Sequence, residues 1–246
     1  MRQTGRRDAA YIVNLLPTSF DGFLGEKGLS DHWRDEFRQE LRKKFKNLRP
    51  YDKQALDQRV KVHLEEITPS NDEISINDVI KWQRIEARRL HTRLKKGASV
   101  LDVFTDSTFR NEGFGTSNAS ADVQVRSVHP LVEHTQMGPY FQNTNEAELA
   151  TLLRGLQIVR NTFQNRGESK EFCQYKRIIV ATSSIMSLQT LNGSATYRHN
   201  RTELRRATRI AAMCKVQAHE ILKTNRNIKS IHFIWLPQLK KASQVV

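Results

Sequence analysis

The hydrophobic pattern of the chain changes near residue 99. Before that point, apolar residues recur every three or four positions, which is the period of a helix with one buried face. After it, short alternating or continuous apolar runs typical of strands are mixed with helical stretches. We therefore expect a helical N-terminal region over residues 1–98 and a mixed α/β domain over residues 99–246.

Three helices are predicted in the N-terminal region. The first begins after Ser30, a favourable N-cap residue, and ends at Pro50. The second covers about residues 52–67, and the third runs from Asn77 to near Gly97. The first helix carries an apolar face formed by Trp33, Phe37, Leu41 and Phe45. We expect this face to pack against the C-terminal domain, and a surface for a protein partner is the alternative.

The C-terminal pattern predicts strand, strand, strand, helix, strand, short helix, long helix and strand. The first strand covers residues 99–104, a turn at 112–115 leads to the second, and residues 123–128 form the third. Residues 129–143 look irregular. The remaining elements are a helix over 145–164, a strand over 177–182, a short helix over 184–191, a long helix over 201–223 and a strand over 229–236. A strand–helix–strand crossover implies a partly parallel sheet covered by helices.

The net charge of the chain indicates which class of binding partner to expect. The chain has 40 Lys and Arg against 26 Asp and Glu, a formal net charge of +14 and a pI near 10.0. Such a surplus favours nucleic acid or another polyanion, although a merely basic protein would share it. Two basic stretches are candidate nucleic-acid contacts. They comprise Arg84, Arg88, Arg89, Arg93, Lys95 and Lys96 in the third helix, and Arg198, Arg201, Arg205 and Arg209 at the long helix.

Other classes of protein are disfavoured. The two cysteines, Cys173 and Cys214, form no C-x-x-C pair, so a zinc site is not expected. No apolar run approaches the roughly 18 residues of a membrane span, and the N-terminus lacks a secretory signal pattern. We expect an intracellular protein without a membrane partner. Nucleus, cytoplasm and mitochondrion are not distinguished.

Four segments resemble the ribonuclease H family, in the family's order, over about residues 99–240. Residues 103–107 (VFTDS) are similar to its first strand, which ends in T-D-G-S. Residues 143–149 (NTNEAEL) are similar to the T-N-N-x-A-E-L start of its first helix. Residues 178–184 (IIVATSS) are similar to its fourth strand, which ends in T-D-S, and residues 231–237 (IHFIWLP) to its V-x-W-x-P strand.

The resemblance implies a ribonuclease H-like mixed sheet flanked by helices, and an acidic site at the carboxyl edge of that sheet. The family cleaves RNA with divalent metals held by carboxylates, the ligands that Mg²⁺ prefers. By resemblance, Asp106 would bridge two metals, and Glu148 would hold the metal near the leaving group. Mg²⁺ or Mn²⁺ is therefore the expected cofactor if the protein is active, and nucleic-acid binding requires none.

Two departures from the family pattern concern this site. Ser183 stands where the family has its third acid, and residues 178–189 contain no Asp or Glu. Pro237 is followed by Gln238 and Leu239, so the family's last helix, with its fourth acid, is not matched. We expect the domain to lack that helix, and Asp106 and Glu148 to form a partial or vestigial site.

Three functions remain open at this point. The first is an RNA- or hybrid-binding protein with impaired catalysis, for example a subunit of a ribonucleoprotein. The second is an active endonuclease that cuts RNA in RNA–DNA hybrids, with ligands supplied by Asp102, Asp122, a partner chain or substrate phosphate. The third is a protein-interaction scaffold that uses the N-terminal helices.

Overall fold

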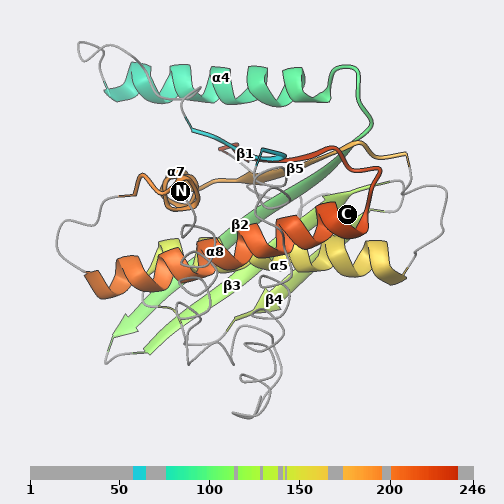
Figure 1. The fold of residues 1–246 in the computed structure, drawn as a ribbon. Coiled ribbons are helices and arrows are strands. Elements are labelled where there is room, and N and C mark those ends of the chain that lie inside the picture. Colours follow the sequence, from blue (N-terminus) through green and yellow to red (C-terminus); the bar gives the residue numbers. More distant parts are fainter. Residues whose placement is uncertain are drawn as a thin grey trace, which may run out of the picture.

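The computed structural model describes residues 58–64, 76–113, 116–127, 130–137, 141, 143–165, 174–195 and 201–237. The helix predicted after Ser30, with its apolar face, lies outside these residues. Among them, the chain forms β1 (Val60–His63), α4 (Ile76–Lys95), β2 (Val100–Gly113), β3 (Thr116–Arg126), β4 (Leu131–Gln136), α5 (Thr144–Asn165), β5 (Arg177–Thr182), α7 (Ile185–Asn192), α8 (Arg201–Thr224) and β6 (Ser230–Trp235) (Figure 1).

One six-stranded sheet in the order β1-β6-β5-β2-β3-β4 organises the fold. The pairs β2–β3 and β3–β4 are antiparallel, whereas β2–β5, β5–β6 and β1–β6 are parallel. The parallel strands are connected through helices, as the predicted crossover requires. A mixed sheet flanked by helices confirms the α/β class and the ribonuclease H-like fold expected from the sequence.

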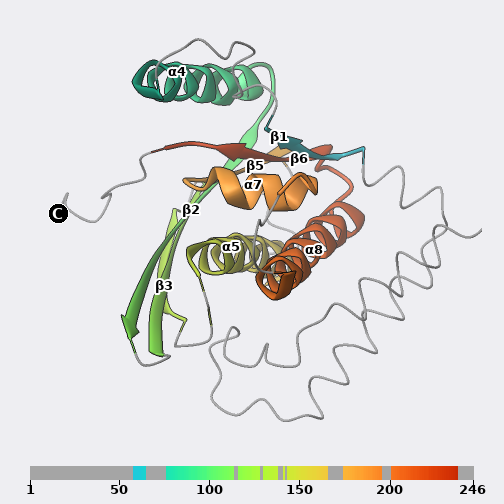
Figure 2. The same cartoon turned by 90° about the vertical axis from the view of Figure 1, so that its left-hand side faces the viewer.

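The helices lie on both faces of the sheet (Figure 2). Helices α5, α7 and α8 cover one face, where most of the buried apolar side chains gather. The side chains of Leu149, Leu152, Leu153 and Leu156 in α5 are fully buried there. Each such leucine contributes about 1.5–3 kcal/mol relative to an exposed one. Helix α4 covers the other face.

Helix α5 approaches the centre of the sheet closely at Gly155. A Cβ atom at this position would lie 3.0 Å from Thr105 Cγ2 and 3.2 Å from Val103 Cγ1 in β2. A glycine in a helix interior costs about 1 kcal/mol relative to alanine. The close contact with β2 accounts for its use here, because a side chain at this position would push the middle of α5 away from Val103 and Thr105.

Local capping explains where the short helix α7 begins and ends. The Ser184 side chain accepts a hydrogen bond from the Ser187 backbone N–H, which is an N-cap interaction. Gly193 ends the helix with φ of 80°, a left-handed conformation that glycine adopts without steric penalty. Both ends agree with the sequence prediction, as do α5, β5, α8 and β6 to within two residues.

Two predicted elements are wrong. The helix expected over 52–67 is replaced over residues 60–63 by β1, which pairs with β6. The apolar spacing of Val60 and Leu64 suits a helix, but Val60 and Val62 also alternate. The Arg59 guanidinium anchors this strand through bonds to the carbonyls of Ile228 and Lys229. Whether the chain divides into domains at residue 98 stays a prediction, although β1 belongs to the common sheet.

The third strand of the C-terminal part was also misplaced. Residues 123–126 continue β3, which runs from Thr116 to Arg126, and the third strand is β4 in the segment expected to be irregular. Strand β4 is at one end of the sheet order, and its residues alternate between exposed and half-buried positions. It therefore lacks the buried apolar alternation by which strands are recognised in a sequence.

Candidate acidic site and basic surfaces

Sheet register brings Asp106 and Ser183 together. Strands β2 and β5 pair in parallel through Thr105 and Thr182, so the residues that follow these two lie next to each other at the carboxyl end of β5. Glu148 comes from the second turn of α5, on the face of the sheet that α5, α7 and α8 cover. Residues of β2, α5 and β5 thus converge on one point.

The Ser183 hydroxyl lies between the two carboxyl groups. It donates to Asp106 Oδ1 at 2.8 Å, and it lies 3.4 Å from Glu148 Oε1. The Thr182 hydroxyl is 3.4 Å from the other Glu148 oxygen. Because a serine hydroxyl has a single hydrogen, the short bond to Asp106 is the principal one. The two acids are therefore joined through a neutral hydroxyl.

Backbone contacts hold Ser183 in this position. The Trp235 indole N–H donates to the Ser183 carbonyl at 2.9 Å, and the Leu236 N–H donates to the Thr182 carbonyl at 2.8 Å. The family-like W-x-P strand therefore has a structural role in this chain, because it fixes the end of β5.

Burial makes Glu148 an unusual carboxyl group. It is 4% exposed, and burial together with the charge of Asp106 raises its pKa to about 7. The hydroxyls around it, including those of Ser183 and Thr182, oppose the rise but only in part. The protonated form of Glu148 is therefore more favoured near neutral pH than that of an ordinary exposed carboxyl group.

This arrangement does not fit a two-metal centre. A pair of divalent ions needs several anionic oxygen ligands, whereas here two carboxyl groups lie on either side of a neutral hydroxyl. Within the part of the chain that the structure describes, no three His, Cys, Asp or Glu side chains gather closely enough to hold a metal ion. We therefore derive no catalytic step through metal ions.

Asp102 was one of two candidates for an additional ligand, and it is already occupied. Its carboxylate is 4% exposed and lies 3.0 Å from His91 Nε2 and 2.5 Å from Lys95 Nζ, both in α4. Although burial opposes it, hydrogen bonds and charge from these two residues lower the pKa of Asp102. Asp102 thus links α4 to the start of β2.

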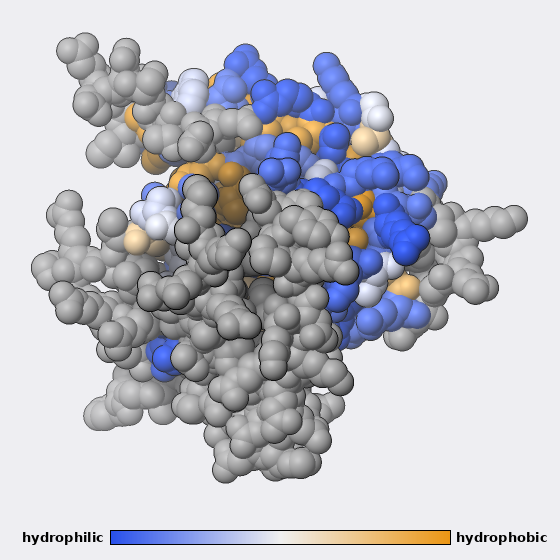
Figure 3. Space-filling view, viewed as in Figure 1, coloured by the Kyte–Doolittle hydropathy of each residue, from blue (hydrophilic) through white to orange (hydrophobic). Residues whose placement is uncertain are grey.

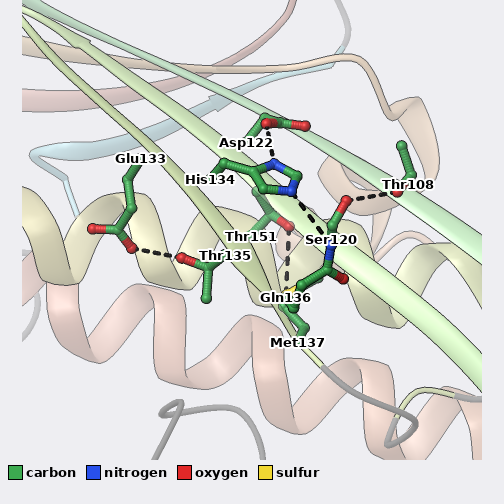
Figure 4. Close-up of polar contacts among 9 residues, drawn as sticks. All are labelled: Thr108, Ser120, Asp122, Glu133, His134, Thr135, Gln136, Met137 and Thr151. Carbon is green, nitrogen blue, oxygen red and sulfur yellow. Dashed lines mark hydrogen bonds and ion pairs between the residues drawn. The ribbon is translucent and has the colours of Figure 1, made fainter.

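Asp122, the other candidate, lies directly across from Asp106 in the β2–β3 register. Its carboxylate instead contacts His134 Nδ1 in β4 at 2.7 Å, and both side chains are about half exposed (Figure 4). Cross-strand register thus aligns Asp106, Asp122 and His134 across three strands. Sequence reasoning missed His134 because it did not predict β4.

The first turn of α5 has a structural role as well. Asn145 donates to the Thr190 hydroxyl at 3.2 Å and accepts from the Ser187 hydroxyl at 3.0 Å, which ties α5 to α7. Glu146 is fully buried and forms an ion pair with Arg206 of α8 at 3.1 Å. The family-like N-E-A-E sequence thus positions Glu148 through its neighbours.

The two helices that carry most of the candidate basic residues, α4 and α8, lie on opposite faces of the sheet (Figure 1). All six candidate residues of the first stretch, Arg84 to Lys96, belong to α4 or follow it directly, and all are exposed. In the second stretch, Arg209 is half-buried, the side chains of Arg201 and Arg205 are not described, and Arg198 lies outside the described residues.

None of the helices in the described ranges is long and apolar enough to cross a membrane.

Comparison with known proteins gives likeness of fold only. No protein-family model matches the sequence, and no curated protein matches it. Among solved structures, RNase H1 of the archaeon Halobacterium salinarum NRC-1 is 15% identical, with a TM-score of 0.37, over 57% of this chain and 87% of that protein. The N-terminal RNase H domain of a Mycobacterium tuberculosis protein is 16% identical, with a TM-score of 0.35, over 57% and 88%.

A third similar structure contains nucleic acid. LC11-RNase H1, solved in complex with an RNA/DNA hybrid, is 15% identical, with a TM-score of 0.33, over 58% of this chain and 88% of that one. At these TM-scores the overall superpositions are loose. The ribonuclease H-like fold of this chain therefore rests on its own strand order and pairing.

Proposed function

We propose that this protein binds nucleic acid, either RNA or an RNA–DNA hybrid, through basic surfaces on its ribonuclease H-like fold, and that it hydrolyses this ligand weakly or not at all. A subunit of a ribonucleoprotein is one setting that would use such a protein. The observation that supports impaired catalysis most directly is the Ser183 hydroxyl, which binds Asp106 at the place of an expected acid.

Charge supports the binding part of the proposal. The formal net charge is +14, and six exposed Lys or Arg side chains gather on and just after α4. Phosphate contacts from such residues supply most of non-specific nucleic-acid affinity and make it dependent on salt. They carry little sequence information, so we expect binding that follows the form of the nucleic acid more than its sequence.

An active endonuclease is the second candidate. Asp106 and Glu148 are both present and share the Ser183 hydroxyl, so part of the expected acid set is assembled. Further ligands would have to come from Asp122 after release from His134, from a partner chain or from substrate phosphate. The protein-interaction alternative concerns the N-terminal helices and stays a prediction.

The test uses the full-length protein with labelled RNA–DNA hybrid, duplex RNA and duplex DNA, each in Mg²⁺ and in Mn²⁺. Each sample is scored both for retention on the protein and for cleavage, with the Asp106→Asn variant as control. We expect salt-sensitive retention of RNA or hybrid, without cleavage above the control. Hybrid cleavage that disappears in Asp106→Asn would establish the second candidate instead, and absence of retention would refute nucleic-acid binding.

A further inference from the structure

Helix α4 has one face that is fully used inside the protein. Its Leu90 and Leu94 side chains are buried against the sheet, in a cluster with Phe104, Ile179 and Ile234. Arg177 of β5 donates to the Leu94 carbonyl at the end of the helix, and Asp102 binds His91 and Lys95. Helix α4 is thus anchored to the sheet, and its opposite face is held in a fixed orientation.

The outer face of α4 carries rows of cations. Residues 76–96 contain seven Lys or Arg and two acids. Arg84 and Arg88 are four residues apart, so they are neighbours on the helix surface and about 6 Å apart along its axis, and Lys96 directly follows the last residue of α4. Figure 3 shows hydrophilic side chains gathered over α4. We call Arg84, Arg88 and Lys96 the α4 ridge.

None of the ion pairs found among the described residues involves the α4 ridge. Within the described ranges, the two acids of α4 pair with other residues, Asp78 with Lys81 and Glu86 with Arg89. Lys95 pairs with Asp102. No acidic partner of Arg84, Arg88 or Lys96 is found among the described residues. Among the described residues, no ion pair therefore compensates the charge of the ridge.

A hollow lies along the same side of the helix. Its volume is about 700 Å³, and its lining among the described residues includes four cations, one acid that is paired with Arg89, and two apolar side chains: Arg88, Arg89, Arg93, Lys96, Glu86, Ile85 and Leu90. Cationic side chains next to an apolar surface suit a sugar–phosphate backbone, whose phosphates are charged and whose sugars are not. Arg and Lys are the usual phosphate ligands of proteins.

An anionic membrane surface would also attract cations, but the distribution of apolar residues disfavours it. A helix that binds a membrane surface inserts its apolar face into the lipid. In α4 that face already packs against the sheet, and among the described side chains of the helix only Ile80 and Ile85 are large, apolar and exposed. The ridge is therefore better suited to a soluble polyanion than to a bilayer.

The N-terminal part of α8, which carries the second basic stretch, does not offer an equivalent surface among its described side chains. Arg206 is paired with the buried carboxylate of Glu146, and Arg209 is half-buried. Helix α8 also packs on the far side of the sheet from α4 (Figure 2). One stretch of nucleic acid bound along α4 would therefore not lie along α8 at the same time.

We infer that the α4 ridge is the principal nucleic-acid interface of this protein and that it binds successive phosphates of a nucleic-acid backbone. The inference rests on the proposed function and specifies its surface. Because α5, which carries Glu148, lies on the other face of the sheet, binding along α4 does not require the acidic site. The ridge therefore gives the protein a backbone-binding surface that is separate from its acid pair.

The test compares two triple variants of the full-length protein with equal loss of charge. The ridge variant carries Arg84→Gln, Arg88→Gln and Lys96→Gln, and the matched control carries Lys215→Gln, Lys223→Gln and Arg226→Gln. The control residues are exposed cations in α8 and just after it. Affinity for a fluorescent RNA–DNA hybrid is measured over a salt series, and circular dichroism and thermal unfolding verify that both variants are folded.

We expect the ridge variant to bind at least ten times more weakly at moderate salt. The slope of log affinity against log salt should fall in magnitude by about 2–3, because each lost phosphate contact removes about 0.9. The control should retain the wild-type slope, and Asp106→Asn should bind as wild type does. Equal weakening of both triple variants would overturn the ridge and leave the proposed function standing.

Two further outcomes are also decisive. If wild-type protein retains no hybrid or RNA at any salt concentration, the proposed function fails together with the ridge. If phosphatidylserine vesicles bind wild-type protein but not the ridge variant, while hybrid binding is unchanged by the variant, the ridge is a membrane-binding surface and the inference is wrong.

Discussion

Two acidic regions on and around β2 differ in how their charge is compensated. Asp102, near the start of the strand, is buried between His91 and Lys95, and its pKa is lowered. Glu148, which faces Asp106 further along the strand, is equally buried but has hydroxyl neighbours, and its pKa is raised to about 7. We therefore expect the ionised Asp102 side chain to stabilise the folded protein and the ionised Glu148 side chain to destabilise it.

This difference shows which acid is structural. A buried charge is retained without penalty only when a partner compensates it. His91 and Lys95 of α4 compensate the buried charge of Asp102 in this way. Asp106 and Glu148 have a serine hydroxyl between them, so packing alone does not account for the presence of both. The proposed loss of catalysis would account for this pair, and the following variants test the contrast between it and Asp102.

The largest effect is expected for Asp102→Asn. The substitution leaves His91 and Lys95 without their carboxylate at the contact between α4 and the sheet. The loss of two hydrogen bonds to a buried carboxylate should lower the free energy of unfolding by about 4 kcal/mol. Urea unfolding at pH 7 measures the change. A loss smaller than the Asp122→Asn loss would show that Asp102 does not anchor α4.

Glu148→Gln should stabilise the protein above neutral pH. The folded pKa of about 7 lies above the ordinary value of 4.5, so wild-type folding is favoured while Glu148 is protonated. That stability is lost as pH rises from 4.5 to about 7. Above pH 7, the variant should therefore gain on the order of 3 kcal/mol relative to wild type, at about 1.4 kcal/mol per pKa unit.

The measurement for Glu148→Gln is urea unfolding at a series of pH values. The difference between variant and wild type should grow from pH 4.5 to 7 and then remain constant. A difference that does not change with pH would mean that Glu148 is ionised normally in the folded protein. The Glu133→Gln variant is a suitable control, because Arg154 and Thr135 lower the pKa of that carboxyl group.

The Ser183→Asp variant tests whether a carboxylate in place of the Ser183 hydroxyl would allow this site to bind a metal ion. A third carboxylate should repel Asp106 and Glu148 and cost about 2 kcal/mol without divalent ions, which is about 4–8 °C in Tm. Added Mg²⁺ should recover most of this loss. Wild-type protein and the Ser183→Ala control should not respond to Mg²⁺. Equal Mg²⁺ stabilisation of wild type would show that two carboxylates already bind the ion.

The smallest effect is expected for Asp122→Asn. Asp122 and His134 are each about half exposed, so water screens their attraction. The free energy of unfolding should change by less than about 0.5 kcal/mol. Thermal unfolding of the variant verifies this value. A loss above about 2 kcal/mol would indicate that the row formed by Asp106, Asp122 and His134 contributes to stability.

Much of the C-terminal fold could be predicted because its elements carry local signals. Residues 177–182 form a continuous apolar run, and they are β5 in the structure, buried between two other strands. Ser184 and Gly193 mark the two ends of α7. The apolar stripe of α8 predicted its length to within one residue. Periodicity and capping are local properties, so they can be read without the rest of the chain.

The missed strands lacked such signals. The four residues of β1 are too few to show a period, and they become a strand because β6 and the Arg59 contacts hold them there. Strand β4 is an exposed edge strand whose partner β3 decides its conformation. Without β4, neither His134 nor its contact with Asp122 could be anticipated.

The sequence by itself determined the balance of charge, the helices and central strands, and the presence of Asp106, Glu148 and Ser183 at family-like positions. Only the tertiary structure decided which carboxylates have cationic partners and which face of the sheet each basic stretch occupies. The physical reason is the separation along the chain over which each effect acts. Propensity, periodicity and capping act within a few residues, whereas strand pairing and the compensation of buried charge join residues that are far apart in the chain.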